Sequence, residues 1–273
     1  MNVYEMITTK ILAEMEQGTV PWHKSWIGVD APIRWKDKKV YRGVNTLLLN
    51  KPGEWLTFKQ CTEAGGKVKK GEKASVVVFF EIKKKINDDG EEETFPFLKY
   101  YNVFHISQCE GIKSKVPPRK PENNPISKAE QIISQYIEKS GLKLTIVNAS
   151  DRAFYRPKTD EVVIPDISQF DSPEEYYSTL FHELVHSTGA KTRLDRKQDP
   201  TELKKVSYGK EELIAEIGSA MLMSFAGIEL PETLKNSAAY LNSWIKAIQG
   251  DNHLIVSASS AASKAVDLIL GQN

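Results

Sequence analysis

The sequence predicts an α+β fold in two domains, and three observations support this prediction. A segment rich in proline and charge, residues 116–125, is typical of an extended linker. On both sides of it, segments rich in β-branched and aromatic residues alternate with segments of helical periodicity. The chain has 273 residues, 40% of them apolar and 27% charged, which is enough for two globular domains. We therefore expect one domain over residues 1–115 and a second over residues 126–273.

The first domain is predicted to begin with an amphipathic helix. Apolar residues recur every four positions from Val3 to Met15, and Gly18 and Pro21 end this pattern. The sequence Asn-Asp-Asp-Gly at residues 87–90 favours the turn of a hairpin. The remaining elements that we expect are, in chain order, short helices over residues 44–49 and 57–64, and strands over residues 75–82 and 95–106.

The second domain is predicted to combine short strands with long helices. Its first helix begins with a capping box, in which Glu130 follows Ser127, and ends at Gly141. Because the strands come before the long helices, an α+β arrangement is favoured over a regular alternation of strand and helix. The other expected elements are strands over residues 144–147, 153–155 and 162–164, and helices over residues 173–188, 209–227, 232–249 and 254–270.

Composition argues against several classes of protein. No apolar run approaches the ~20 residues that span a bilayer, and the N-terminus lacks the pattern of a secretory signal. The two cysteines, Cys61 and Cys109, form neither a disulfide framework nor a cysteine-based zinc site. We therefore expect a cytoplasmic protein without a membrane partner.

The charge is distributed unevenly along the chain. Residues 1–120 contain 21 Lys and Arg against 15 Asp and Glu, whereas residues 121–273 contain 16 against 21. The basic part also holds four of the five tryptophans, namely Trp22, Trp26, Trp35 and Trp55. This division indicates two separate tasks, with the first part suited to a polyanion.

The sharpest chemical signal is the sequence His182-Glu183-Leu184-Val185-His186. A helix start at Ser172 and a helix end at Gly189 frame it. At about 100° per residue the two histidines are about 40° apart, so both rings project from one side and can bind one metal ion. Glu183 is near enough to reach a water on that metal. The alternative, two surface histidines on an amphipathic helix, fits the apolar flanks and caps less well.

A catalytic zinc site normally has a third protein ligand. One known arrangement places a histidine ten residues after the first, but that position here is Thr192. The next predicted helix offers Glu212 and Glu216, which share a face among apolar residues. We expect Glu212 to be the third ligand and Glu216 to orient one imidazole. If Glu212 is only a favourable charge at the helix start, Glu216 becomes the ligand.

These residues predict metal-dependent cleavage of an amide bond. Zinc lowers the pKa of its bound water to ~7 and polarises a carbonyl group. Another divalent ion such as Mn²⁺ is the alternative cofactor. Glu183 would take the proton of that water and pass it to the leaving amine. Tyr155 and Tyr208 are candidates for stabilising the oxyanion, although a structural role fits each of them as well.

The basic part contains the groups that single-stranded nucleic acid requires, which are cations for phosphates and flat rings for bases. The opposing interpretation is that the lysines form a solvated face and the tryptophans fill a core. The residues alone leave both interpretations open. The candidate contacts are Trp22, Trp26, Trp35, Arg42, Lys67, Lys69, Lys70 and Lys73.

Longer segments resemble a known family over nearly the whole chain. VYEMITTKILAEMEQGTVPWHKSW, YRGVNTLLL, WLTFKQCTEAGGKVKKGEKASVVVFF and KYYNVFHISQCEGI resemble the N-terminal domain of ArdC-type antirestriction proteins. FYRPKTDEVVIPDISQF, FHELVHSTG and EELIAEIGSAML resemble the zincin-like metallopeptidase domain of the same family. Several motifs in a fixed order are far more specific than any single motif. One departure is Ala190, where family members often have a histidine.

The resemblance implies a small α+β domain that binds single-stranded DNA, followed by a zincin-like metallopeptidase domain. It implies carriage on a plasmid or another mobile element and protection of incoming DNA from restriction. Glu183 is then the catalytic glutamate, His182 and His186 are metal ligands, and Glu212 and Glu216 correspond as a pair. A host protein is a candidate substrate.

Two other functions remain open at this point. One is a DNA-independent cytoplasmic zinc metalloprotease that acts on a protein target. The other is a binding protein in which the metal only stabilises the fold.

Overall fold

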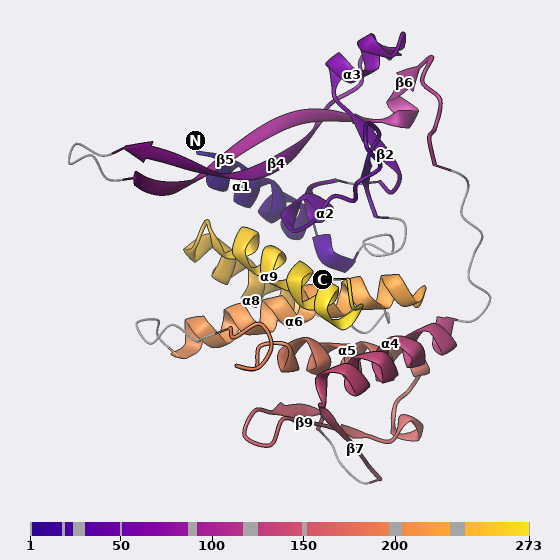
Figure 1. Cartoon of the computed structure of the whole chain (residues 1–273), viewed down its shortest axis with the longest axis vertical. Coiled ribbons are helices and arrows are strands. Elements are labelled where there is room, and N and C mark those ends of the chain that lie inside the picture. The colour runs from indigo at the N-terminus through magenta and orange to yellow at the C-terminus, as the bar shows by residue number, and fades with distance from the viewer. Residues whose placement is uncertain are drawn as a thin grey trace.

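The chain combines helices and strands throughout, which confirms the predicted α+β class (Figure 1). We call residues 2–116 the N-terminal part and residues 125–272 the C-terminal part. The division into two domains at the proline-rich segment stays a prediction, because most of that segment lies outside the described residues. The computed structural model describes residues 2–17, 20–23, 31–49, 51–86, 92–116, 125–148, 152–196, 204–229 and 238–272.

The N-terminal part is built on a four-stranded sheet with the strand order β1-β2-β5-β4. Strands β4 and β5 form a long antiparallel hairpin, in which Ser75 pairs with Val103 and Ile86 with Glu92. Its helical elements are α1 (Val3–Glu16), η1 (Pro21–His23), α2 (Val44–Leu48), α3 (Phe58–Glu63) and η2 (Ile106–Gln108). Its strands are β1 (Ile33–Arg34), β2 (Glu54–Leu56), β3 (Lys67–Val68), β4 (Ser75–Ile86), β5 (Glu92–His105) and β6 (Cys109–Glu110).

Most predicted elements of this part are present, and the differences have local causes. Helix α1 begins with a capping box formed by Asn2 and Glu5, and its last helical residue is Glu16. Strands β4 and β5 are longer than expected, and the predicted turn between them lies outside the described residues. Strands β1, β2, β3 and β6 were not predicted, because two or three residues are too few to show a pattern.

The C-terminal part places a three-stranded sheet beneath a layer of helices (Figure 1). Strand β9 is central, parallel to β7 and antiparallel to β8. The strands are β7 (Lys143–Val147), β8 (Phe154–Arg156) and β9 (Glu161–Pro165). The helical elements are α4 (Pro125–Ser140), η3 (Ile167–Gln169), α5 (Pro173–Ser187), α6 (Lys204–Ala226), α8 (Ala238–Gly250) and α9 (Leu254–Ile269).

The boundaries of this part differ from the prediction at two helix starts. Helix α4 begins at Pro125, so Ser127 lies inside the first turn and the predicted N-cap is wrong. Helix α6 begins at Lys204 rather than at residue 209. The predicted helix 232–249 corresponds to α8, and its first six residues lie outside the described residues.

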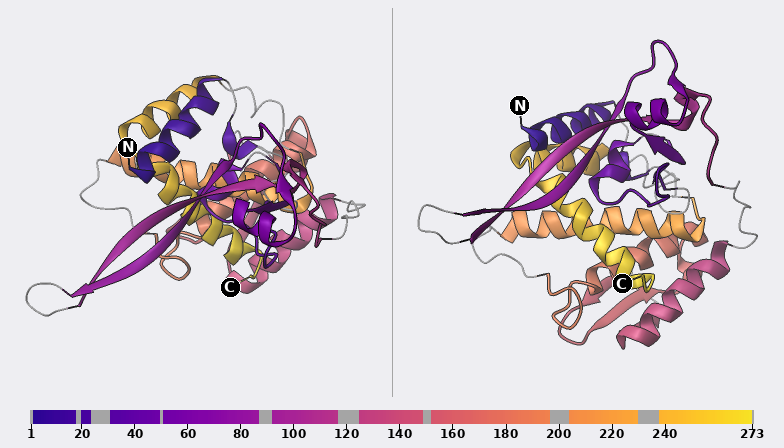
Figure 2. Two further views of the ribbon diagram at one scale, coloured as in Figure 1. Left: turned by 90° about the horizontal axis from the view of Figure 1, so that it is seen from above. Right: turned by 45° about the horizontal axis from the view of Figure 1, so that its top comes forward.

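One hydrophobic core joins the two parts. Ile7 and Ile11 of α1 and Leu47 of α2 are at most 1% exposed and belong to the same cluster as the buried faces of α5, α6 and α9. Helix α1 packs beside α8, as both views of Figure 2 show. Trp22 of η1 is also part of this core and packs against α6. Removing either part would therefore expose the apolar face of the other.

Polar contacts reinforce this interface. The hydroxyl of Thr8 donates to the carbonyl of Asn252 (3.0 Å), and Arg42 forms an ion pair with Asp267 of α9. The N–H of Gly43 donates to Ser263 Oγ (3.0 Å), and the φ of Gly43 is 58°, a region that favours glycine. Two segments of the N-terminal part, α1 and the residues just before α2, are thus fixed on α9 and on the loop that precedes it.

Within the described residues, no helix has both the length and the apolar character needed to cross a membrane.

Candidate metal centre and its surroundings

Helices α5 and α6 pack closely and carry the residues predicted for the metal site. The N-terminus of α5 is capped by Ser172, whose Oγ accepts a hydrogen bond from the N–H of Glu175 (3.2 Å). The buried face of α5 includes Val185, which is 0% exposed. A Cβ atom on Gly218 of α6 would lie only 2.8 Å from Val185 Cγ2. The close approach of the two helices therefore requires glycine at position 218.

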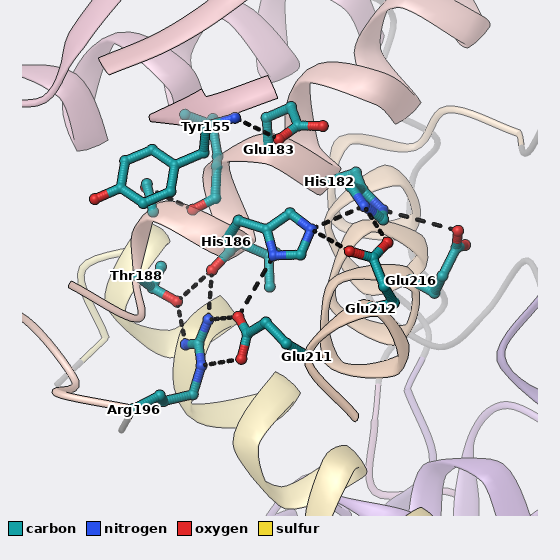
Figure 3. A network of polar contacts seen from close by, with 12 residues as sticks. Tyr155, His182, Glu183, His186, Thr188, Arg196, Glu211, Glu212 and Glu216 are labelled. Atoms are coloured by element: carbon teal, nitrogen blue, oxygen red, sulfur yellow. Dashed lines mark hydrogen bonds and ion pairs between the residues drawn. The ribbon is translucent and has the colours of Figure 1, made fainter. Parts of the chain in front are cut away.

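His182, His186 and Glu212 meet between these helices (Figure 3). The Nε2 atoms of the two histidines are 3.1 Å apart. Glu212 Oε2 lies 3.5 Å from Nε2 of His182, and Glu212 Oε1 lies 3.5 Å from Nε2 of His186. Ligand atoms about 2.0–2.1 Å from a tetrahedral metal are about 3.4 Å from one another. The donor set and its spacing therefore fit a divalent ion.

The second ring nitrogen of each histidine faces another carboxylate of α6. Nδ1 of His182 is 3.8 Å from Glu216 Oε1, and Nδ1 of His186 is 3.5 Å from Glu211 Oε1. Glu216 was expected near one imidazole, but Glu211 was missed by the sequence analysis. The only signal in the sequence was that Glu211 directly precedes Glu212. Whether the Glu211 side chain faces His186 depends on how α6 is rotated against α5.

The surrounding carboxylates determine the electrostatics of the site. Burial lowers the pKa of His182, but Glu212, Glu216 and Glu183 together raise it above the usual value. Burial raises the pKa of Glu216 more than the nearby histidines lower it. For Glu211 burial also acts upward, but His186 and Arg196 hold its pKa below the usual value. Such a concentration of acids around two imidazoles favours a bound cation.

Glu183 points from α5 toward the C-terminal sheet. It is 9% exposed, and its Oε2 accepts a hydrogen bond from the backbone N–H of Tyr155 in β8 (2.8 Å) (Figure 3). This contact holds the carboxylate on the side of α5 next to the strand. The predicted general base is therefore held by a backbone group.

The hydroxyl of Tyr155, a candidate for oxyanion stabilisation, points away from the histidines (Figure 3). It donates to Asp160 Oδ1 (2.8 Å), and burial together with this hydrogen bond raises the pKa of Tyr155 to about 12. Asp160 also pairs with the buried Arg193, with 2.5 Å between Oδ2 and Nη2. The phenol thus belongs to a structural network. The side chain of the other candidate, Tyr208, lies outside the described residues.

The tryptophans predicted to contact nucleic acid differ in how exposed they are. Trp22 is 1% exposed and lies in the core, so its ring offers no face for a base, contrary to the expectation. Trp35 is half-buried: its Nε1 donates to the carbonyl of Lys113 (3.1 Å), and Lys115 Nζ lies 3.4 Å from its ring centre. Trp26 lies outside the described residues.

The predicted cations also differ in what they contact. Arg42 is held by Asp267, as described above, and Lys67 pairs with Glu110 (3.1 Å). Lys69 Nζ donates to the carbonyl of Ser107 (2.8 Å). The structure brings the lysines together beside β3 and β6, and Arg42 lies apart from them at the interface with α9. Lys70 and Lys73 are exposed, and no acidic partner for them is found among the described residues.

The strands and helix around these lysines carry a local excess of positive charge. We call residues 33–39, 54–73 and 105–116 the basic lobe, which contains α3 and the paired strands β3 and β6 (Figure 1). It holds 11 Lys and Arg against 5 Asp and Glu. One of the acids, Glu54, is buried and accepts a hydrogen bond from the N–H of Lys115 (2.9 Å). Phe58 is 62% exposed on the same lobe and was not predicted as a contact.

The fold and the site together define the class of protein. Residues 129–261 match the family model of zincin-like metallopeptidases, and residues 1–104 match that of the N-terminal domain of the anti-restriction factor ArdC. The chain belongs to the family of ArdC-type antirestriction proteins, as its sequence had suggested.

Solved structures agree over nearly the full length. The metal-free crystal structure of the antirestriction ArdC protein from the R388 plasmid is 35% identical, with a TM-score of 0.80, and the match covers 98% of this chain and 97% of that chain. The Mn(II)-bound crystal structure of the same protein is 34% identical, with a TM-score of 0.79 and coverage of 99% and 98%.

Relatives known from their sequences include a much longer protein. A DNA primase TraC of Escherichia coli is 33% identical over 98% of this chain, but the chain spans only 20% of TraC. The y4eC protein of Sinorhizobium fredii is 31% identical, with 99% of this chain and 92% of y4eC covered.

Proposed function

We propose that this antirestriction protein binds single-stranded DNA through its N-terminal part and hydrolyses a peptide at a divalent metal held by its C-terminal part. The observation that carries the second half of the proposal is the meeting of two histidines and one glutamate between α5 and α6. Their facing atoms are 3.1–3.5 Å apart. The first half depends on the family and on the charge of the basic lobe.

We assign His182, His186 and Glu212 as the metal ligands. Glu212 is preferred over Glu216 because its two oxygens face the Nε2 atoms of both histidines, whereas Glu216 faces only Nδ1 of His182. Zinc is the metal most often bound by this donor set in hydrolases. Manganese is the alternative, since a relative has been crystallised with Mn(II).

The proposed chemistry needs a proton acceptor beside the metal. A bound divalent ion lowers the pKa of its water and polarises a carbonyl. Glu183 would accept the proton of the attacking water and donate it to the leaving amine nitrogen. The N–H of Tyr155, which donates to Glu183 Oε2, would keep the carboxylate in place during both transfers. Because the Tyr155 hydroxyl is bound to Asp160, we do not assign it to the oxyanion.

The proposed DNA site is the basic lobe. Single-stranded DNA is bound through its phosphates by clustered cations, and its bases stack on exposed rings. Lys70 and Lys73 supply exposed cations, and Phe58 supplies an exposed ring. Trp22 is not included, because it lies in the core. Nothing in this arrangement selects a base sequence, so we expect recognition of the backbone.

The metal half is tested by titrating the metal-free full chain with Zn²⁺ and with Mn²⁺. Wild type is expected to bind one ion, and His186→Ala is expected to lose that binding. Glu183→Gln should bind the ion normally but fail to cleave a labelled unfolded protein. If Glu183→Gln keeps every activity of wild type, the metal only stabilises the fold and the peptidase assignment is wrong.

The DNA half is tested by measuring the affinity of the full chain for a labelled oligothymidylate over a series of salt concentrations. We expect affinity to fall steeply with salt, and Lys70→Gln with Lys73→Gln to reduce the logarithmic slope by about 0.7 for each phosphate that is no longer neutralised. Lys158→Gln, an exposed lysine of the C-terminal part, is the matched control and should leave the slope unchanged. Absent binding with retained proteolysis would favour the DNA-independent metalloprotease.

A further inference from the structure

Arg196 joins the end of α5 to Glu211 in α6. Its side chain is 13% exposed. It holds Glu211 in a bidentate pair, with Nη2 2.5 Å from Oε1 and Nε 3.1 Å from Oε2. The remaining donors are also used: Nη1 donates to Thr188 Oγ1 (2.5 Å) and Nη2 to the carbonyl of Val185 (2.9 Å). Arg196 thus donates hydrogen bonds to four acceptor atoms on three residues.

The glycine that ends the histidine motif makes room for this arginine. A Cβ atom on Gly189 would lie 3.0 Å from Arg196 Nη2 and 3.2 Å from Arg196 Cζ. A larger residue would therefore press on the guanidinium group. The absence of a side chain at Gly189 thus lets Arg196 reach Glu211.

The pair of Arg196 and Glu211 reaches the metal centre through His186 (Figure 3). The oxygen of Glu211 that Arg196 holds, Oε1, lies 3.5 Å from Nδ1 of His186. A histidine that binds a metal through Nε2 carries its proton on Nδ1, and an acceptor at that nitrogen fixes the tautomer and the plane of the ring. Glu211 is placed to be that acceptor, and Arg196 keeps it from turning away.

The other histidine lacks such support. Nδ1 of His182 faces Glu216 at 3.8 Å, slightly farther than the 3.5 Å between Nδ1 of His186 and Glu211, and within the described part of the chain Glu216 has no arginine or lysine partner. The carboxylates beside the two imidazoles therefore differ in whether an arginine holds them.

We propose that Glu211 and Arg196 are positioning residues for His186, with Arg196 acting through Glu211. The inference rests on the proposed metal centre and extends it to two residues that do not contact the metal. Loss of either residue should weaken metal binding although all three ligands remain. Outer residues of this kind typically change metal affinity by about 10- to 100-fold.

The test is the affinity of the full chain for Mn²⁺, followed by electron paramagnetic resonance of the free ion. Glu211→Ala and Arg196→Met should bind Mn²⁺ about 10- to 100-fold more weakly than wild type. Glu211→Gln should lie between them and wild type, because its amide oxygen can still accept from Nδ1. The double variant should bind no more weakly than Glu211→Ala alone, since Arg196 acts through Glu211.

The matched control is Arg156→Met, which breaks a comparable pair with Glu161 (2.8 Å) in the sheet of the same part. It should bind Mn²⁺ like wild type even if it unfolds at a lower temperature. Should Glu211→Ala fail to fold, Glu211→Gln and Arg196→Met carry the test.

The experiment distinguishes failure of the positioning role from failure of the metal centre. If wild type binds Mn²⁺ and the Glu211 and Arg196 variants bind it equally well, the positioning role is wrong while the metal centre stands. If wild type binds neither Mn²⁺ nor Zn²⁺, the proposed centre itself is wrong, and the positioning role is wrong with it.

Discussion

Glu161 shows how a single buried charge is accommodated in the C-terminal sheet. Its side chain is 7% exposed, and its carboxylate contacts Lys143 Nζ (2.8 Å), Thr145 Oγ1 (2.6 Å) and Arg156 Nη1 (2.8 Å). The hydrogen bonds from Lys143 and Thr145, with the charge of Arg156, lower the pKa of Glu161 to about 2. The ionised form is therefore the one that the folded sheet stabilises.

This shift predicts an acid-sensitive contribution to stability. Because the folded pKa is lower than the unfolded pKa, the contribution is complete above about pH 4.5 and is lost as the pH falls toward about 2. The free energy of unfolding of wild type should fall more steeply over this range than that of Glu161→Gln, measured by urea denaturation. Parallel curves for the two proteins would contradict the assignment.

The buried ring of Trp22 should contribute strongly to the stability of the chain. Because it is 1% exposed and packs between the two parts, Trp22→Ala should reduce the free energy of unfolding by about 3–5 kcal/mol. The fraction of the variant that is folded should bind DNA as wild type does, since the ring has no exposed face. A loss of DNA affinity in folded Trp22→Ala would show that the ring reaches DNA after all.

At the scale of elements, the spacing of α5 and α6 depends on Gly218. A methyl group there would meet Val185 at 2.8 and 3.0 Å, inside a tightly packed core. Gly218→Ala should therefore destabilise the chain by about 1–3 kcal/mol and weaken metal binding, because the two helices carry different ligands.

Gly209 provides the matched control for this change. It lies in the same helix, and a Cβ atom there would have no neighbour within 4 Å among the described residues. Gly209→Ala should leave metal affinity unchanged and raise helix stability by up to about 1 kcal/mol. Equal effects of the two substitutions, in calorimetry and metal titration, would exclude the steric explanation.

Elements with a long periodic pattern could be predicted from the sequence, and short ones could not. Helix α5 was placed to within one residue because Ser172 and Gly189 mark its ends. Strand β1 has only two residues and pairs with β2, which is distant in the sequence, so no local pattern predicts it. The start of α4 was missed because Pro125 begins the helix before the apparent capping box.

In the metal centre, too, residues with a local spacing could be predicted and residues that depend on tertiary packing could not. The spacing of His182 and His186 is local, so the histidine pair could be predicted, whereas Glu211 and Arg196 depend on the packing of α5 on α6. The tryptophans illustrate the reverse problem. Trp22 and Trp35 have the same chemistry in the sequence, but tertiary contacts bury one and leave the other half-buried. Composition alone cannot distinguish a core ring from a binding ring.

At the scale of the whole molecule, the common core predicts cooperative behaviour. Helices α1 and α2 bury their apolar faces against the C-terminal helices, so residues 1–116 produced alone should lack a stable fold. The full chain should unfold in a single transition when followed by circular dichroism. Well-dispersed amide signals from the isolated segment in a nuclear magnetic resonance spectrum would contradict this expectation.

The interface between α1, α2 and the C-terminal helices has a consequence for the peptide connection between residues 116 and 125. Affinity between the two pieces comes from buried side chains, so an intact backbone at that point is dispensable for keeping them together. Two separately synthesised polypeptides, divided there and mixed, should reassemble into a non-covalent heterodimer with the shape of the parent.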